Sequence, residues 1–235
     1  MNEGEKRLKM KTFIKASIFL IKKLERLVFP PCCLICGKLL NETYCKDCEK
    51  RISEKLSLKI ENKDKKVYYF GKHIYLFTYK DEIRNLILDY KFNDKSYFYE
   101  LFSKIITKNE KICGILEKYD IIIPVPIHKK RKQKRGYNQS ELITREISKK
   151  IPSLIHENTA LQKTKHNVEQ SSLSKEQRNQ NVKNVYKIIN KEKIENKNII
   201  LFDDIYTTGN TVNEISKILK QNGANKILVL TIAKD

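Results

Sequence analysis

The chain has 235 residues, of which 40% are hydrophobic, so it is long enough for one α/β domain with its own core and a small appendage. Its formal net charge of +20 indicates a polyanionic partner, although part of the lysine excess accompanies many Asn and Ile residues and is compositional. No apolar run is long enough to span a membrane, and the first residues lack a secretory signal. The sequence therefore predicts a cytoplasmic protein with no integral membrane segment.

Residues 1–30 are predicted to form an amphipathic helix that ends at Pro30-Pro31. Its apolar residues share one helical face: Leu20, Ile21, Leu24, Leu27 and Val28. The helix either packs on the rest of the protein or, because it is basic, contacts anionic membrane or DNA.

Residues 31–52 contain two Cys-x2-Cys pairs, Cys33/Cys36 and Cys45/Cys48. Disulfides are rare in a reducing cytoplasm, and paired thiolates at this spacing are typical of a tetrahedral zinc site. Four sulfur ligands leave no position for water, so the predicted zinc ion is structural. Cys32 is an alternative ligand to Cys33, because an x3 spacing to Cys36 is also feasible.

After a polar segment, predicted to be a linker over residues 53–66, residues 67–235 are predicted to form the second domain. It has a connecting or specificity part (67–118) and a core (119–235). The predicted strands are residues 67–70, 74–79, 121–125, 199–202 and 227–231, and the predicted helices are residues 83–88, 99–106, 138–150 and 212–222. Alternation of strands and helices predicts an α/β fold with a parallel sheet flanked by helices.

The strongest signal for function is residues 198–211. An apolar strand is followed by Asp203 and Asp204, then by a polar turn that opens a helix. The turn residues are Thr207, Thr208, Gly209, Asn210 and Thr211. Backbone N–H groups at a helix start bind phosphate, and ligands of parallel sheets bind at the carboxyl ends of strands. A surface turn capped by threonines is the alternative.

This segment resembles the phosphoribosyl pyrophosphate (PRPP) binding motif of type I phosphoribosyltransferases. The resemblance implies that Asp203 and Asp204 bind the ribose hydroxyls and that Thr207 to Thr211 bind the 5′-phosphate. It also implies Mg²⁺, bridging the ribose hydroxyls and the pyrophosphate.

A second segment runs from the strand at residues 121–125 into a predicted basic loop, residues 129–135, in which six of the seven residues are Lys or Arg. Asn138 is expected to cap the next helix, with Glu141 completing a capping box. In phosphoribosyltransferases the corresponding loop binds pyrophosphate. The resemblance therefore assigns that group to four residues: His128, Lys129, Arg131 and Arg135. A solvated basic turn is the alternative.

The string Pro124-Val-Pro-Ile-His-x2-Arg-x3-Arg-Gly-Tyr-Asn-Gln-Ser140 resembles the signature of the ComF family, which includes ComFC-type competence proteins. Further similar positions are Tyr79, Arg84, Leu86, Ile87, Lys91, Phe92, Leu161, Gln170, Arg178 and Asn181. Lys163 and Asn167 stand where the family has Arg and Thr, and Asp81 stands where Gly is common.

The resemblance implies a phosphoribosyltransferase-like protein that acts in natural competence and DNA uptake with other competence proteins. A transferase would join an acceptor nitrogen to C1 of PRPP, and the acceptor is not named by these residues. The alternatives without transferase activity are a protein that binds single-stranded DNA and a PRPP-sensing regulator. The histidines other than His128, namely His73, His156 and His166, are expected at the surface.

Overall fold

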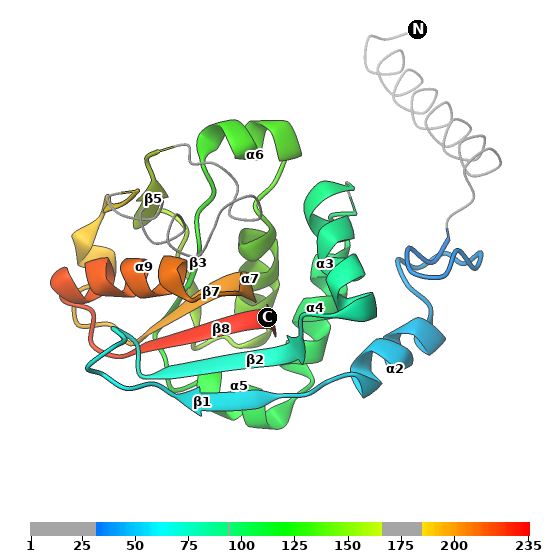
Figure 1. Ribbon diagram of the computed structural model, residues 1–235, viewed down its shortest axis with the longest axis horizontal. Coiled ribbons are helices and arrows are strands. Elements are labelled where there is room, and N and C mark those ends of the chain that lie inside the picture. Colours follow the sequence, from blue (N-terminus) through cyan, green and yellow to red (C-terminus); the bar gives the residue numbers. More distant parts are fainter. Residues whose placement is uncertain (1–31, 94, 166–184) are drawn as a thin grey trace, which may run out of the picture. The chain divides into compact units, whose positions relative to one another are not determined.

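The computed structural model describes residues 32–93, 95–165 and 185–235 (Figure 1). The chain divides into two compact units, residues 1–51 and 52–235. The predicted N-terminal helix of residues 1–30 lies outside the described residues, and so do His166, Asn167, Gln170, Arg178 and Asn181. Among the residues described, every helix is too short or too polar to cross a membrane.

The described part of the first unit is built around cysteines. Cys33, Cys45 and Cys48 are buried and pack with a few partly buried apolar side chains. Gly37 adopts a φ of 77°, as the turn after the first cysteine pair requires. Helix α2 (Lys46–Glu54) begins directly after Cys45 and carries Cys48. The short segment therefore has a core of sulfur atoms rather than of large apolar side chains.

The second unit contains a six-stranded sheet in the order β1-β2-β8-β7-β3-β4. Its strands are β1 (Lys59–Asn62), β2 (Lys72–Thr78), β3 (Ile121–Pro124), β4 (Ile155–His156), β7 (Ile199–Tyr206) and β8 (Ile227–Lys234). Neighbouring strands are parallel except β1 and β2. A separate antiparallel pair joins β5 (Leu161–Lys163) to β6 (Tyr186–Ile188). The prediction of an α/β fold with a parallel sheet is confirmed.

The helices of this unit are α3 (Asp81–Phe92), α4 (Phe98–Thr107), α5 (Glu110–Leu116), α6 (Lys129–Arg135), α7 (Gln139–Lys150) and α9 (Asn210–Gln221). One face of the sheet packs on α9, where Val212, Ile215 and Leu219 meet Leu201 and Val229. Helix α7 packs on β3, β4 and β7, and α4 packs on α7. Because helices cover both faces, the central strands are buried almost without interruption.

Three predictions about local structure are wrong. Residues 53–66 were expected to be a linker but contain β1, a short edge strand whose partly exposed residues lack an apolar pattern. Residues 67–70 form turns and bends instead of a strand, although Phe70 is buried in the core. The basic loop at residues 129–135 is helix α6, because His128 caps its start and Gly136, with φ of 81°, ends it.

The expectation that His73 lies at the surface is also wrong. His73 on β2 is fully buried, its Nε2 lies 3.0 Å from Thr231 Oγ1, and its ring stacks on Tyr206 with 4.2 Å between centroids. Burial lowers the pKa of His73 to about 4; Glu61 opposes this shift, and the charges of Lys63 and Lys234 add to it. The neutral imidazole is therefore part of the folded core.

We expect this histidine to make the protein sensitive to acid. The unfolded chain takes up the His73 proton near pH 6.5, whereas the folded chain does so near pH 4, so stability falls as pH decreases between these values. His73→Phe, which keeps a stacking ring, should reduce the loss of unfolding free energy between pH 7 and pH 4.5 by roughly 1–3 kcal/mol. Urea unfolding at pH 7 and pH 4.5 measures the free energy of unfolding. An equal loss in the wild type and in His73→Phe would contradict the prediction.

Candidate functional site

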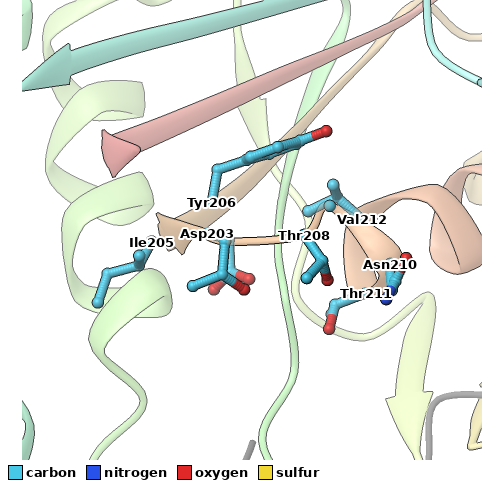
Figure 2. Close-up of a pocket in the computed structure, with 9 residues that line it drawn as sticks. Asp203, Ile205, Tyr206, Thr208, Asn210, Thr211 and Val212 are labelled. Carbon is cyan, nitrogen blue, oxygen red and sulfur yellow. The ribbon is translucent and has the colours of Figure 1, made fainter. Parts of the chain in front are cut away.

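Asp203 and Asp204 lie in the carboxyl-terminal half of β7, which continues to Tyr206, and have different surroundings. Asp203 lines a pocket, whereas Asp204 is buried and forms an ion pair of 2.8 Å with Lys91 of α3. The Asp204 backbone N–H donates to Asp203 Oδ1 at 2.9 Å. The pocket (Figure 2) is lined by Asp203, Ile205, Tyr206, Thr207, Thr208, Gly209, Asn210, Thr211 and Val212. The structure thus brings Asp203 together with the whole predicted phosphate turn.

The turn between β7 and α9 is shaped by Gly209, which has a φ of 76°. A Cβ atom there would overlap the hydroxyl of Tyr206, so the close approach of the turn to the Tyr206 ring requires glycine. Figure 2 shows the side-chain oxygens of Asp203, Thr208 and Thr211 on one side of the turn, with the Tyr206 ring on the other. Carboxylate, hydroxyl and helix N-terminal N–H groups therefore face one space, which suits a ligand with both hydroxyl and phosphate groups.

The charges of Asp203 and Asp204 lie close together and disfavour each other. Burial and the adjacent charge of Asp204 raise the pKa of Asp203 to about 7, although Lys91, the Asp204 N–H and Lys163 act in the opposite direction. A carboxylate in this setting gains from any hydroxyl donor or cation that replaces lost water. The pair is therefore poised to bind a ligand that supplies such groups.

The β5–β6 pair contributes a cation near Asp203. Burial and the charge of Arg131 lower the pKa of Lys163, and Asp203 partly offsets the effect. Lys163 Nζ also lies 5.6 Å from the ring centroid of buried Tyr186. Burial and Asp203 raise the pKa of the Tyr186 hydroxyl, and Arg131 again opposes them. Lys163, Tyr186 and Arg131 thus share the electrostatic environment of Asp203, while Asn167 lies outside the described residues.

The predicted pyrophosphate residues occupy different places on and before α6. His128 Nδ1 accepts the backbone N–H of Lys130 at 3.2 Å, so this side chain is a helix cap. Lys129 is exposed on the first turn of the helix. Arg131, on the same helix, is the member of this group whose charge acts on the surroundings of Asp203.

Arg135, at the end of α6, contacts Gln139 and Phe92. Its Nη1 donates to Gln139 Oε1 at 2.6 Å, and its guanidinium lies 5.2 Å from the centroid of the Phe92 ring. The charges of Arg131 and Asp203 both act on the pKa values of Lys163 and Tyr186, and those of Arg135 and Asp204 both act on the pKa of Tyr90.

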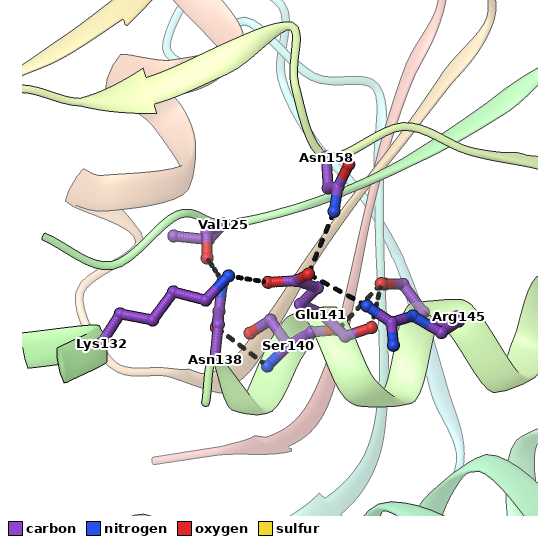
Figure 3. Close-up of polar contacts among 8 residues, drawn as sticks. Val125, Lys132, Asn138, Ser140, Glu141, Arg145 and Asn158 are labelled. Atoms are coloured by element: carbon purple, nitrogen blue, oxygen red, sulfur yellow. Dashed lines mark hydrogen bonds and ion pairs between the residues drawn. The ribbon is translucent and has the colours of Figure 1, made fainter. Parts of the chain in front are cut away.

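The junction between α6 and α7 is held by Asn138 and Glu141 (Figure 3). Asn138 Nδ2 donates to Val125 O at 3.1 Å, and its side-chain oxygen accepts the Ser140 N–H at 3.2 Å, which confirms the predicted cap. The Glu141 carboxylate accepts from three side chains, Lys132 (2.8 Å), Arg145 (3.1 Å) and Asn158 (3.0 Å). These contacts connect α7, which carries Glu141, with α6 and with the segment after β4. None of the three is the contact with the backbone N–H of Asn138 that a capping box requires.

In the first unit, the sulfur atoms of Cys33, Cys36, Cys45 and Cys48 all lie within 4.8 Å of one another. Cys32 is outside this group and forms an isolated bridge with Leu39, so the cluster selects Cys33. Burial alone would raise the pKa of Cys33, but backbone N–H groups lower it to about 6. This donor set fits zinc, which binds four thiolates tetrahedrally.

Residue patterns alone missed two neighbours of the site. Lys91, which pairs with Asp204, is one of the positions before residue 119 that resemble the ComF family. That resemblance is the signal that could have identified it. Tyr186 lies on the three-residue strand β6 and belongs to no recognisable motif.

No family model matches the chain. The chain is 31% identical over 171 residues to competence protein F of Haemophilus influenzae, covering 70% of this chain and 73% of that protein. It is 28% identical over 208 residues to competence protein ComFC of Bacillus subtilis, covering 81% and 72%. It is also 28% identical over 160 residues to DNA utilization protein YhgH of Escherichia coli K12, covering 66% and 69%.

Among solved structures, the chain is similar to a hypoxanthine phosphoribosyltransferase from Staphylococcus aureus, with 15% identity and a TM-score of 0.37 over 58% of this chain and 65% of that one. A purine phosphoribosyltransferase from Pyrococcus horikoshii has 14% identity and a TM-score of 0.38 over 60% and 85%.

We expect the purified protein to carry about one zinc ion per chain, because four thiolates converge on one point. Replacing two ligands in Cys45→Ser/Cys48→Ser should abolish the bound metal, whereas Cys32→Ser, which changes the cysteine outside the cluster, should retain it. Metal analysis after anaerobic purification provides the measurement. A metal-free wild type, or loss of zinc in Cys32→Ser, would refute the assignment.

Proposed function

Because the chain belongs to the ComF family of competence proteins, we propose that it is a phosphoribosyltransferase-like protein that binds PRPP with Mg²⁺ at the carboxyl end of β7 and acts in natural competence. The observation that carries the proposal is the pocket in which Asp203 and residues 207–211 face the same space. A ribose phosphate has hydroxyls for the carboxylate and a phosphate for the helix start.

Within this proposal, each group has a role that follows from its position. Asp203 accepts hydrogen bonds from the ribose hydroxyls, and the N–H and hydroxyl groups of the turn hold the 5′-phosphate. Arg131, whose charge acts near Asp203, and Lys129 neutralise the pyrophosphate. Carboxylate and hydroxyl oxygens are ligands that Mg²⁺ prefers, so the donors fit this ion, which supplies charge neutralisation at the pyrophosphate when bound.

In a transferase reaction, the acceptor nitrogen forms a bond to C1 as the bond from C1 to the pyrophosphate oxygen breaks. The electron pair leaves with pyrophosphate, so positive charge on α6 lowers the barrier to its departure. The carboxylates act by holding the ribose in line with the acceptor and do not attack C1. The described side chains thus catalyse by positioning and charge.

Asp203→Asn should test the site directly. The substitution keeps the shape but removes the charged acceptor, and charged hydrogen bonds contribute about 1.5–3 kcal/mol, so PRPP affinity should fall by roughly one to two orders of magnitude. The unfolding temperature should not fall, because burial already disfavours the Asp203 charge. Calorimetric titration of PRPP with Mg²⁺ measures the binding.

Asp89→Asn is the matched control, because Asp89 lies on α3 and pairs with Lys95. It should bind PRPP as tightly as the wild type. If the wild type binds no PRPP, or if Asp203→Asn binds it equally well, the proposal is refuted. Binding without transfer to any base would favour a PRPP-sensing regulator.

Single-stranded DNA binding is a second candidate function, favoured by α6. Six of its seven residues are basic and none of them is buried. One group of relatives is named for DNA utilization. A cationic helix binds nucleic acid phosphates with strong salt dependence and little sequence preference.

The two candidate functions can be separated with exposed lysines of α6. Lys130→Gln/Lys134→Gln should weaken single-stranded DNA binding and reduce the slope of log affinity against log salt by about 2, since each lysine accounts for about one phosphate contact. Lys149→Gln/Lys150→Gln, at the end of α7, is the charge-matched control. Fluorescence anisotropy at rising salt concentration measures the affinity for single-stranded DNA. An affinity that does not change with salt, or that is the same in the wild type and the α6 variant, would exclude this function.

A further inference from the structure

The ion pair between Lys91 and Asp204 joins the acidic pair to a helix outside the core segment of residues 119–235. The Lys91 ammonium lies 2.8 Å from Asp204 Oδ1, and the two side chains are only 20% and 12% exposed. An ion pair shielded from water to this extent resists screening by salt. Removing one partner would leave a charge without compensation in a poorly solvated place.

The end of α3 that carries Lys91 is anchored on both sides of this residue. The Tyr90 hydroxyl donates to Gln139 O at 2.8 Å, and the Tyr137 hydroxyl donates to Tyr90 O at 2.7 Å. On the other side, the Phe92 ring packs beneath the Arg135 guanidinium. Tyr90 is fully buried. Lys91 therefore extends from a backbone that is tied to the junction of α6 and α7.

Three consecutive residues thus contact the acidic pair and the junction of α6 and α7. Lys91 contacts the acidic pair, and Tyr90 and Phe92 contact the end of α6 and the start of α7. Asp204 in turn donates its backbone N–H to the Asp203 carboxylate. A continuous chain of contacts therefore runs from α3 through Asp204 to the residue that lines the pocket.

We propose that Lys91 is a positioning residue of the PRPP site, which holds Asp204 in place and compensates its charge so that the acidic pair can accept the ribose hydroxyls. The role rests on the proposed function, because it acts on the same ligand. Lys91 acts through Asp204 and does not itself contact the reacting atoms. Lys91, which lies outside the core segment of residues 119–235, is therefore part of the binding machinery.

The test compares PRPP affinity, measured by calorimetry with Mg²⁺, in three lysine variants. Lys91→Met should weaken binding about tenfold, since it leaves the charge of Asp204 without compensation in a poorly solvated place. Lys91→Arg, which retains a cation, should restore much of the loss. Lys95→Met, which removes the cation paired with Asp89 near the same helix end, should bind like the wild type.

A double-mutant cycle separates positioning from a general effect on folding. In an Asp204→Asn background, Lys91→Met should cause little further loss of affinity, because its partner is already neutral. The inference is overturned if Lys91→Met binds like the wild type, if Lys91→Arg fails to restore binding, or if the loss persists in full beside Asp204→Asn. A wild type without PRPP affinity would overturn the proposed function and this role together, whereas each of the other failures leaves the proposed function intact.

Discussion

Two carboxylates on adjacent residues at the end of a buried strand repel each other, and compensation of their charge shapes the surroundings of β7. The compensation comes from separate parts of the chain: Lys91 on α3, Lys163 on β5 and the backbone N–H of Asp204. Loops from several elements meet at the carboxyl edge of a parallel sheet, so charged side chains distant in sequence can reach the pair. Charge compensation at this edge therefore depends on residues that are far apart in the sequence.

The opposite charge is gathered on α6, and the fold keeps it at a fixed place. Seven residues with six positive charges would repel one another as an isolated peptide. Here His128 and Gly136 cap the helix ends, while Glu141 accepts from Lys132 and the segment after β4. A cationic group held in this way is organised before a ligand arrives, and preorganised charge stabilises an anion more effectively than mobile charge does.

Local motifs allowed the sequence to predict the strand, turn and helix around Asp203 and the four-cysteine cluster, because each lies within a short span. The sequence analysis predicted a loop instead of α6, because neighbouring like charges oppose a helix and their compensation by Glu141 comes from the next helix. The ion pair of Lys91 with Asp204 and the burial of His73 depend on contacts between distant strands and helices. Those contacts exist only once the sheet has assembled, so no spacing pattern encodes them.

The close approach of Gly209 to the Tyr206 hydroxyl has an evolutionary consequence. As long as a large ring occupies position 206, a side chain at position 209 would meet it, in addition to the cost of a positive φ. The two positions are therefore not free to drift independently. Among relatives, a residue other than glycine at the equivalent of 209 should accompany a smaller residue at the equivalent of 206, and this correlated change would mark lineages in which the turn has been remodelled.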